Sequence, residues 1–249
     1  MEQLLYQGKA KQIFSGPDPH TIIIRFTDNV TAGNGKKRAT IPGKGALAAH
    51  ISIKLFELLS TQNIPTHYIR QLDEQSFVAT KVQIIPLEVV VRNWAAGSIV
   101  KRLGIPRGRA FQPPLVEFFY KSDALGDPPL CEPHILTLGL ATKEELAQIT
   151  TLAQRAAATL TEYFATLQLK LIDMKFEFGR ADSGIVLADE ISPDTMRLWD
   201  ARTDESLDKD VFREDKGDLL ATYREVARRM GIHPHPQPLS PSRERGAEG

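Results

Sequence analysis

The chain has 249 residues, of which 42% are hydrophobic and 25% are charged, and 31 Lys and Arg residues balance 31 Asp and Glu residues. This zero net charge disfavours a nucleic-acid or membrane-surface partner, since both usually require a basic excess, and no apolar stretch approaches the roughly 20 residues that span a bilayer. A single cysteine, Cys131, excludes an internal disulfide. Together with an N-terminus that lacks a basic start and a long apolar run, it predicts a cytoplasmic protein.

The first 88 residues are predicted to form a small lobe, an antiparallel sheet that carries one helix. Residues 1–14 and 21–26 read as a strand pair, because β-branched and apolar residues flank turn residues between them. A loop is expected from 30 to 45. Apolar residues spaced three and four apart then predict an amphipathic helix over 45–62. Three further strands of this sheet are predicted at 66–72, 76–83 and 87–94.

Residues 89–230 are predicted to form a larger α/β lobe. A short helix at 97–103 is followed by a Pro- and Gly-rich segment, 105–130, which we expect to be an ordered loop serving a site. Thr142 and Glu145 form the pattern of a capping box, and a long apolar face predicts a helix over 142–167.

The remaining elements are two strands, a last helix and a tail. Strands are predicted at 169–179 and 184–192, and a helix at 209–230. From Gly231 onward the chain is rich in Pro, Ser and charge and is predicted to be disordered. The fold class is therefore α/β (α+β) with two lobes and a cleft between them.

One strand presents a charged face that could hold a metal. Asp173, Lys175 and Glu177 alternate with apolar residues, and the next strand ends in Asp189 and Glu190. If the connecting loop has an odd number of residues, Glu177 faces Asp189, and two facing carboxylates favour a bound cation such as Mg²⁺. The alternative is a solvated strand face on which Lys175 neutralises its neighbours.

Two other segments could bind anions. Gly8 with Lys9 and Lys11 offers backbone N–H and ammonium groups to a phosphate, although an exposed turn with solvated lysines would look the same. Arg92 lies shortly before Ser98, which opens the helix at 97–103. A helix N-terminus beside a guanidinium suits a phosphate or carboxylate, and the alternative is an ordinary helix cap.

Several of these segments, in this order, resemble the SAICAR synthetase family of purine biosynthesis. The matching strings are LLYQGKAKQIF, FTDNVTAGNGKK, VVVRNWAAGSIVKRLG, LIDMKFEFG, ADEISPDTMRLWD and VARRMG. The resemblance implies two lobes with ATP between them, the smaller one similar to the small lobe of protein kinases.

The resemblance also implies an ATP-dependent ligase. It would join carboxyaminoimidazole ribotide (CAIR) and L-aspartate into SAICAR, with ADP and phosphate as products and an acyl phosphate on the way. ATP and Mg²⁺ are the implied cofactors, and a homo-oligomer such as a dimer is expected. Two alternatives stay open: another small-molecule phosphotransferase with a similar nucleotide site, and a nucleotide-binding module without turnover.

Roles for individual residues are implied by the same resemblance. The implied ATP-binding residues are Lys9, Ala10, Lys11, Lys81, Ile84, Ile85 and Glu88. The implied substrate-binding residues are Gly33, Asn34, Gly35, Arg92, Ser98, Lys121, Asp127, Lys175, Arg197 and Arg213. Of these, Lys175, Arg92 and Arg197 are implied to be catalytic, and Glu177 and Asp189 are the implied Mg²⁺ ligands.

Overall fold

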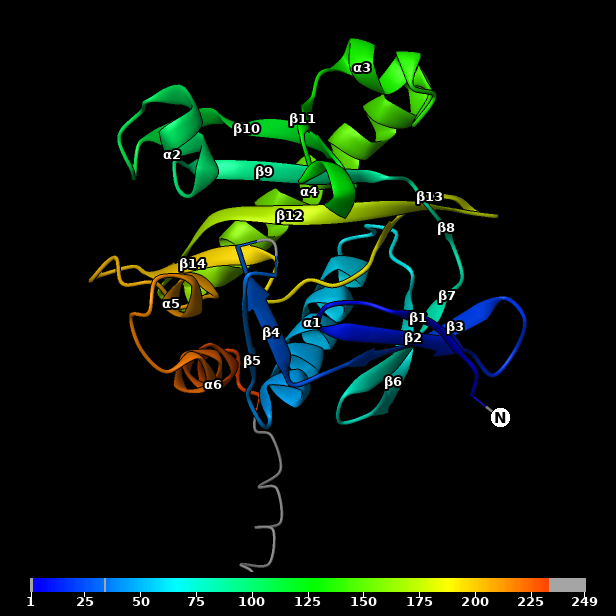
Figure 1. The fold of residues 1–249 in the computed structure, drawn as a ribbon, viewed down its shortest axis with the longest axis horizontal. Helices are drawn as coiled ribbons and strands as arrows, with labels where there is room; N and C mark the ends of the chain where they lie inside the picture. Colours follow the sequence, from blue (N-terminus) through cyan, green and yellow to red (C-terminus); the bar gives the residue numbers. More distant parts are fainter. Residues whose placement is uncertain (1, 34, 233–249) are drawn as a thin grey trace, which may run out of the picture.

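The computed structural model describes residues 2–33 and 35–232, which form two main antiparallel sheets around shared helices (Figure 1). The N-terminal sheet has the strand order β1-β2-β3-β7-β6. Its strands are β1 (Leu4–Gln7), β2 (Lys11–Ser15), β3 (Thr21–Phe26), β6 (Tyr68–Asp73) and β7 (Ser76–Thr80). Helix α1 (Lys44–Thr61) confirms the predicted amphipathic helix and packs against this sheet.

A separate hairpin interrupts the segment that was predicted to be a loop. Strands β4 (Asn29–Ala32) and β5 (Lys37–Thr40) pair with each other, so the expectation of a loop from 30 to 45 is wrong. Each strand has only four residues, and β5 carries Lys37 and Arg38, so the alternation of apolar residues is too short in β4 and absent in β5.

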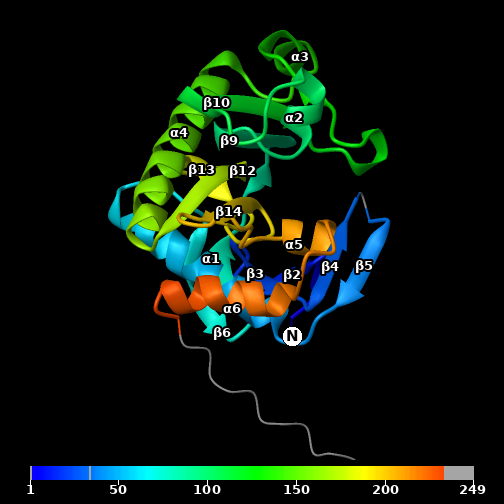
Figure 2. The same ribbon diagram turned by 90° about the vertical axis from the view of Figure 1, so that its left-hand side faces the viewer.

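The second sheet has seven strands, ordered β11-β10-β9-β12-β13, with β8 and β14 also pairing with β12. Its strands are β8 (Gln83–Ile84), β9 (Leu87–Trp94), β10 (Ala110–Tyr120), β11 (Pro129–Leu130), β12 (Leu169–Ala181), β13 (Gly184–Ala188) and β14 (Met196–Asp200). Helix α4 (Lys143–Thr166) covers one face of this sheet (Figure 2). The strand at 87–94 thus exists as predicted but belongs to this sheet and not to the N-terminal one, because periodicity does not say which neighbour a strand pairs with.

The ordered loop expected at 105–130 is largely a strand. Residues 110–120 form β10, and Pro113 and Pro114 lie where its pairing with β9 is interrupted, between Ala110 and Leu115. Prolines have no N–H to donate, so they are tolerated at such an irregularity. Because Pro113 and Pro114 are unusual within a strand, the composition of this segment favoured a loop.

The remaining helices are short apart from the last. They are α2 (Ser98–Leu103), the 3₁₀ turn η1 (Asp123–Leu125), α3 (Glu132–Thr137), α5 (Asp210–Arg213) and α6 (Leu219–Arg229). The single helix predicted at 209–230 is therefore two helices. The break lies at Asp215, whose φ of 54° is left-handed, and Asp218 caps α6 by accepting hydrogen bonds from the N–H groups of Leu220 and Ala221.

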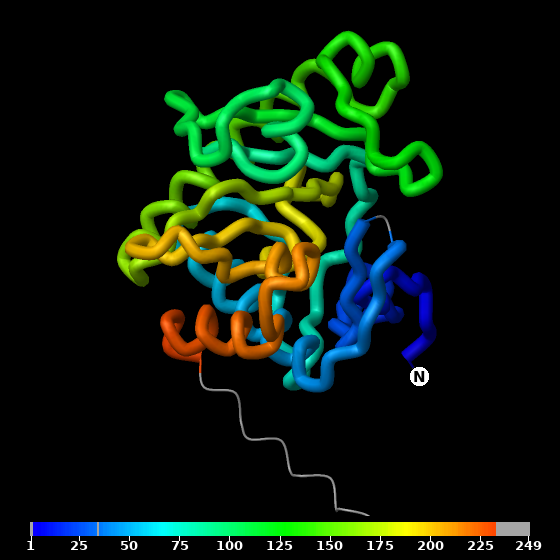
Figure 3. Tube along the Cα trace, turned by 60° about the vertical axis from the view of Figure 1, so that its left-hand side comes forward, coloured from blue at the N-terminus to red at the C-terminus, as the bar shows by residue number. Residues whose placement is uncertain are grey.

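One apolar core joins the two sheets. Phe77 of the N-terminal sheet, Phe56 of α1 and Phe176 of β12 are fully buried in it, and α1 also packs against α4 and α6. The N-terminal strands and α6 lie on the same side of the seven-stranded sheet (Figure 3). No helix among the described residues is both long and apolar enough to cross a membrane.

The C-terminal prediction is tested at only two positions. Gly231 and Ile232 are described, and Ile232 packs against the core, so the predicted disorder does not begin at Gly231. Residues 233–249, on which the rest of that prediction falls, lie outside the described residues.

Candidate active site

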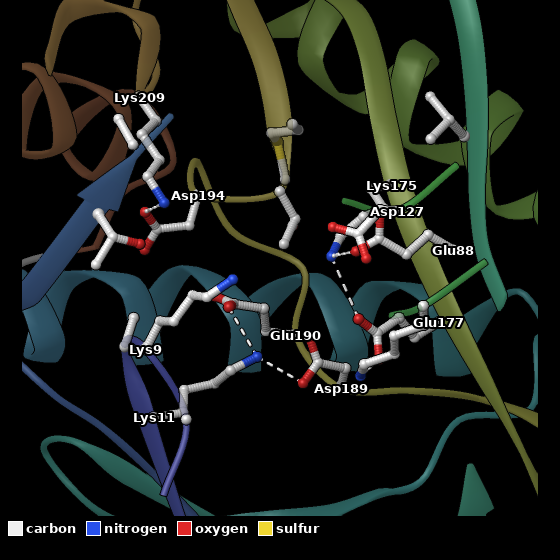
Figure 4. A pocket seen from close by; sticks show the side chains of 18 of the residues that line it. Lys9, Lys11, Glu88, Asp127, Lys175, Glu177, Asp189, Glu190, Asp194 and Lys209 are labelled. Atoms are coloured by element: carbon white, nitrogen blue, oxygen red, sulfur yellow. Dashed lines mark hydrogen bonds and ion pairs between the residues drawn. The ribbon is translucent and has the colours of Figure 1, made fainter. Parts of the chain in front are cut away.

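A cavity of about 640 Å³ opens between the two sheets (Figure 4). Its walls come from the β1–β2 turn, the β4–β5 hairpin, β9, β12, the segment after β13 and the start of α5. Most of the residues that the sequence pointed to line this cavity. They are Lys9, Ala10, Lys11, Gly33, Gly35, Glu88, Arg92, Lys121, Asp127, Lys175, Glu177, Asp189, Arg197 and Arg213.

Lysines separate the carboxylates at one end of this cavity. The Lys175 Nζ lies 2.5 Å from Glu88 Oε1 and 3.3 Å from Glu177 Oε1, and Lys121 pairs with the other Glu177 oxygen. Burial would lower the pKa of Lys175, but Glu177, Glu88 and Asp189 outweigh it and raise that pKa. Lys175 is therefore a fixed positive charge, and not a proton donor or acceptor, near neutral pH.

Asp189 forms the second half of this charge cluster. Lys11 Nζ lies 2.5 Å from Asp189 Oδ1 and 2.8 Å from Glu190 Oε1. Burial raises the pKa of the Asp189 carboxyl, yet the ammonium groups of Lys11, Lys121 and Lys175 together hold it well below its ordinary value. Asp189 is thus an anion in the pH range of most enzymes.

The predicted register of the two strands is wrong by one residue. Glu177 pairs with Ala188 and not with Asp189, because β12 and β13 are joined at Ala181 and Gly184 through a two-residue turn. Asp189 follows β13 with a left-handed φ of 63°. This bend, which strand periodicity does not reveal, turns Asp189 into the same charge cluster as Glu177.

His67 fixes the backbone at that bend. Its Nε2 lies 3.1 Å from the carbonyl oxygen of Asp189, to which the neutral ring donates. Burial lowers the pKa of His67 to about 4, so the imidazole is neutral at physiological pH. Nothing local in the sequence around His67 indicates this contact, since Asp189 is more than 100 positions away.

Two arginines converge on Asp173 at another part of the cavity. Arg92 Nη1 lies 2.6 Å from Asp173 Oδ2, and Arg197 Nη1 lies 3.0 Å from the same oxygen. Arg197 also donates through Nε to Asp210 at 2.7 Å. Arg92 likewise donates through Nε to Glu117 at 2.6 Å. Asp173 is buried, so it and these outer carboxylates hold the two guanidinium groups in place on the cavity wall.

Gly97 makes room for this arginine pair. A Cβ at Gly97 would lie 2.7 Å from Arg197 Cζ, and its φ of 65° with ψ of −134° is a conformation that glycine adopts readily. Ser98, the next residue, is exposed at the start of α2 and is not among the residues that line the cavity. The close neighbour of the Arg197 guanidinium in this segment is Gly97, and the predicted role of Ser98 stays a prediction.

The residues predicted to bind the nucleotide base lie elsewhere than in this cavity. Lys81 lines a smaller cavity beside His20 and Asp182. Ile84 is partly exposed, whereas Ile85 is buried in the core and donates its N–H to the carbonyl of Phe178. The third glycine-loop residue, Asn34, lies outside the described residues.

Comparisons with known proteins show the family of this chain. The family model described as SAICAR synthetase matches residues 4–230. The chain belongs to the SAICAR synthetase family. It is 50% identical over 226 residues to the phosphoribosylaminoimidazole-succinocarboxamide synthase of Persephonella marina, covering 91% of this chain and 95% of that one.

Solved structures of SAICAR synthetases share the fold. The enzyme from Ehrlichia chaffeensis has a TM-score of 0.91 at 43% identity, covering 93% of this chain and all of that one. A SAICAR synthetase in complex with ADP has a TM-score of 0.88 at 45% identity, covering 90% of this chain and 96% of that one. The predicted family and the α/β fold class are therefore confirmed.

Four further residues of the cavity received no role from the sequence. Asp173 was predicted on the charged strand face and Glu190 at the end of the next strand, whereas Asp194 and Lys209 were assigned to no site. The contact of Lys209 with Asp194 brings the residue before α5 to the cavity, and no local sequence pattern indicates it.

The donor set fits a metal ion that arrives with a nucleotide. Among residues 2–33 and 35–232, no group of three or more His, Cys, Asp or Glu side chains is arranged to hold a metal by itself. Glu177 and Asp189 nevertheless offer anionic oxygens whose present partners are lysines. Mg²⁺ bound with nucleotides typically takes one or two carboxylates and completes its shell with phosphates and water.

Proposed function

We propose that this protein is an ATP-dependent ligase that joins the carboxylate of CAIR to the amino group of L-aspartate, giving SAICAR, ADP and phosphate. The observation that carries the proposal is the set of charged side chains in the cavity of a chain of this family, where eight cations lie among eight carboxylates. The carboxylates hold the cations in place and suit a bound cation, and the cations, which come from both sheets and from α5 with the residue before it, suit several anionic substrates. The cations are Lys9, Lys11, Arg92, Lys121, Lys175, Arg197, Lys209 and Arg213.

The chemistry explains why cations and not a nucleophile fill the site. A carboxylate is a poor acyl donor in water, because an oxide would have to leave. Transfer of the γ-phosphoryl group of ATP to a carboxylate oxygen releases ADP and makes an acyl phosphate. The aspartate amine, after losing a proton, attacks its carbonyl carbon, and phosphate leaves with the C–O electron pair. Both steps depend on positioning and charge neutralisation.

The nucleotide half of the site would lie against the N-terminal sheet. Lys9 and Ala10, in the turn between β1 and β2, and Lys11, at the start of β2, line the cavity and would cover the phosphates of ATP. Glu88 would accept hydrogen bonds from the ribose hydroxyls. The strap formed by Lys81, Ile84 and Ile85 connects the two sheets and is proposed to lie along the adenine.

The substrate half would use the charged face of β12 and the arginine pair. Lys175 is proposed to hold the reacting carboxylate, since its ammonium group lies in the cavity between two carboxylates that it can exchange for substrate. Arg92 and Arg197, with Ser98 nearby, would bind the ribotide phosphate, which suits paired guanidinium groups. Less central members of this substrate site are Gly33, Asn34, Gly35, Lys121, Asp127 and Arg213.

Glu177 and Asp189 would hold Mg²⁺ when the nucleotide binds. The ion would neutralise charge on the phosphates during transfer. In the described structure the lysines Lys11, Lys121 and Lys175 pair with these carboxylates. As the ion arrives, Lys11 and Lys121 are proposed to move onto the phosphates and Lys175 onto the reacting carboxylate.

Three broader features complete the proposal. We propose a nucleotide-binding lobe (1–88) and a substrate- and metal-binding lobe (89–230), with the boundary at the start of β9. The enzyme is proposed to be cytoplasmic and to form a homo-oligomer such as a dimer, which light scattering on the purified protein would test.

Substrate dependence of ADP release tests the function. The proposal requires both CAIR and L-aspartate for sustained ADP release, and SAICAR in equal amount. A phosphotransferase with a similar nucleotide site would release ADP with its second substrate and without L-aspartate. ADP release that ignores L-aspartate would therefore contradict ligation, and no turnover with any of these substrates would point to a binding module.

A further inference from the structure

A carboxylate behind the cavity wall holds one of the two arginines that lie on that wall. Arg92 donates through Nε to Glu117 Oε2 at 2.6 Å, and its Nη1 donates to Asp173 Oδ2 at 2.6 Å. Glu117 is not among the residues that line the cavity. Two carboxylates therefore engage two of the three guanidinium nitrogens, and Nη2 has no hydrogen-bond partner among residues 2–33 and 35–232.

The strand pairing places Glu117 beside Arg92. In the antiparallel pair of β9 and β10, Arg92 pairs with Leu115, and Val90 pairs with Glu117. Glu117 is thus a diagonal neighbour of Arg92 on the same face of the sheet, within reach of a long side chain. The pairing is regular from Leu115 to Tyr120. The backbone ladder therefore fixes where both side chains start.

Burial makes this second carboxylate necessary for Arg92. The Arg92 side chain is 4% exposed and shares Asp173 with Arg197, so Asp173 alone would leave one of two positive charges uncompensated. Arg197 has Asp210 as its second partner. Glu117, whose side chain is 17% exposed, is the second partner of Arg92. Removing the counter-ion of a buried charge is costly, so the arginine would shift toward other contacts.

The other oxygen of Glu117 ties helix α2 to the sheet. Oε1 contacts Nη2 of Arg102 in the last turn of α2, and Arg102 Cζ lies 5.5 Å from the centroid of the Phe119 ring. Arg102 is 29% exposed and does not line the cavity. The two oxygens of Glu117 thus have different roles, one toward the cavity arginine and one toward a helix at the surface.

We propose that Glu117 is a positioning residue that orients Arg92 toward the phosphate of the ribotide substrate. The inference rests on the function proposed above and adds a residue that does not contact the substrate itself. With Nε and Nη1 held by protein carboxylates, the guanidinium plane is fixed and Nη2 is the donor left for a phosphate oxygen. Without Glu117 the guanidinium would be held only by Asp173 and could turn about that contact. The loss would concern the phosphate and no other part of the substrate.

Binding of CAIR with and without its phosphate tests this assignment. Glu117→Met keeps the length of the side chain and removes both acceptor oxygens. In isothermal titration calorimetry the Kd of CAIR should rise about tenfold or more, as expected for a misplaced charged contact, whereas the Kd of the CAIR nucleoside, which lacks the phosphate, should stay within about threefold of wild type. A general structural defect would raise both constants alike.

Two control variants separate the contact with Arg92 from other effects. Arg102→Met removes a half-exposed partner of Glu117 and leaves the contact with Arg92 in place, so the preference for CAIR over its nucleoside should stay within about twofold of wild type. Glu145→Met removes the carboxylate of another arginine–glutamate pair, with Arg180, away from the cavity. It should lower thermal stability and leave both dissociation constants unchanged.

The outcomes separate this inference from the function on which it rests. A wild-type protein that binds CAIR without L-aspartate-dependent turnover would overturn the function and leave the binding test of Glu117 in force. An unchanged or larger preference for CAIR over its nucleoside in Glu117→Met would overturn the assignment, and so would an equal loss of preference in Arg102→Met.

A second variant covers the case in which Glu117→Met does not fold. Glu117→Gln keeps one acceptor oxygen in place of two, so the preference for CAIR over its nucleoside should fall by about threefold or more. A folded Glu117→Gln variant with the wild-type preference would contradict the proposal.

Discussion

Lys175 illustrates how a side chain of the proposed site would exchange a protein carboxylate for a substrate carboxylate. Its ammonium group lies between Glu88 and Glu177 and is held charged by them, so a substrate carboxylate can replace one protein carboxylate without changing the charge state of the lysine. The alternation in LIDMKFEFG identified this residue from sequence. Its partner Glu88, from another strand, is 87 positions away, and only the fold brings the two together.

Replacing Lys175 should separate its function from its contribution to folding. Lys175→Met is expected to lower turnover by about 10²–10³-fold, the cost of removing one preorganised charge at a reacting centre. The melting temperature should change little, because the side chain faces the cavity and not the core. Lys170→Met, on the same strand and paired with Asp204 at the surface, is the control. Wild-type turnover in the Lys175→Met variant would show that Lys175 has no role in the site.

Gly97 matters through the space it leaves for Arg197. In Gly97→Ala the new Cβ would lie 2.7 Å from Arg197 Cζ, so the guanidinium must shift and the KM for CAIR should rise about tenfold or more. Gly104→Ala is the control, since Gly104 also has a positive φ, 62°, but has no neighbour within 4 Å of an added Cβ. Equal KM values for CAIR in both variants would contradict this role.

The lowered pKa of His67 makes the stability of the folded protein depend on pH. Its pKa is about 4 in the folded protein against an ordinary value of 6.5, so between those values the unfolded chain binds a proton that the folded one does not. Stability must then fall as the pH decreases from 6.5 to 4, by up to about 3 kcal/mol from this residue. Urea unfolding at pH 7, 5.5 and 4.5 should show a smaller loss in His67→Gln than in wild type. Parallel losses would mean that His67 is not buried in its neutral form.

Among the secondary-structure elements, α4 was the most fully predicted. Thr142 Oγ1 accepts from the N–H of Glu145, whose carboxylate accepts from the N–H of Thr142, as the capping box requires. The carboxylate also pairs with Arg180 of β12, which lowers the pKa of Glu145 to about 2. The sequence predicted the capping box but not the ion pair between Glu145 and Arg180.

Truncating Glu145 should therefore cost more than an average surface change. Glu145→Ala is expected to lower the free energy of unfolding by about 1–2 kcal/mol, the range for a lost helix cap. Glu162→Ala, an exposed position on the same helix, should cost less than about 0.5 kcal/mol. Urea denaturation followed by tryptophan fluorescence measures both, and equal effects would show that the cap and the Arg180 tie add nothing.

Elements in which apolar residues recur at a regular spacing could be predicted from the sequence. Elements that depend on pairing with another strand could not. Helices α1 and α4 and strands β12 and β13 follow from local spacing alone. The β4–β5 hairpin and β10 depend on backbone partners, and the register of β12 against β13 depends on the number of residues in the turn. The same holds for the site: the sequence indicated most of its charged residues, but not which of them contact one another.

For the whole molecule, the zero net charge is the sum of a basic N-terminal part and an acidic C-terminal part. Residues 1–122 carry 16 Lys and Arg against 8 Asp and Glu, whereas residues 123–230 carry 13 against 21. The halves meet at the cavity. The first contributes four cations, Lys9, Lys11, Arg92 and Lys121, and the carboxylate Glu88. The second contributes the other seven carboxylates, Glu177 and Asp189 among them, together with Lys175, Arg197, Lys209 and Arg213. We infer that this meeting of charges lets one cavity hold anionic substrates and a cation together.

The path of one oxygen atom tests the central claim most directly. CAIR labelled with ¹⁸O in its carboxylate is incubated with the protein, ATP, Mg²⁺ and L-aspartate, and the released phosphate is analysed by mass spectrometry. Ligation through an acyl phosphate predicts one ¹⁸O atom in each phosphate, because the carboxylate oxygen leaves with it. Phosphate without ¹⁸O, formed while SAICAR accumulates or without it, would contradict this account.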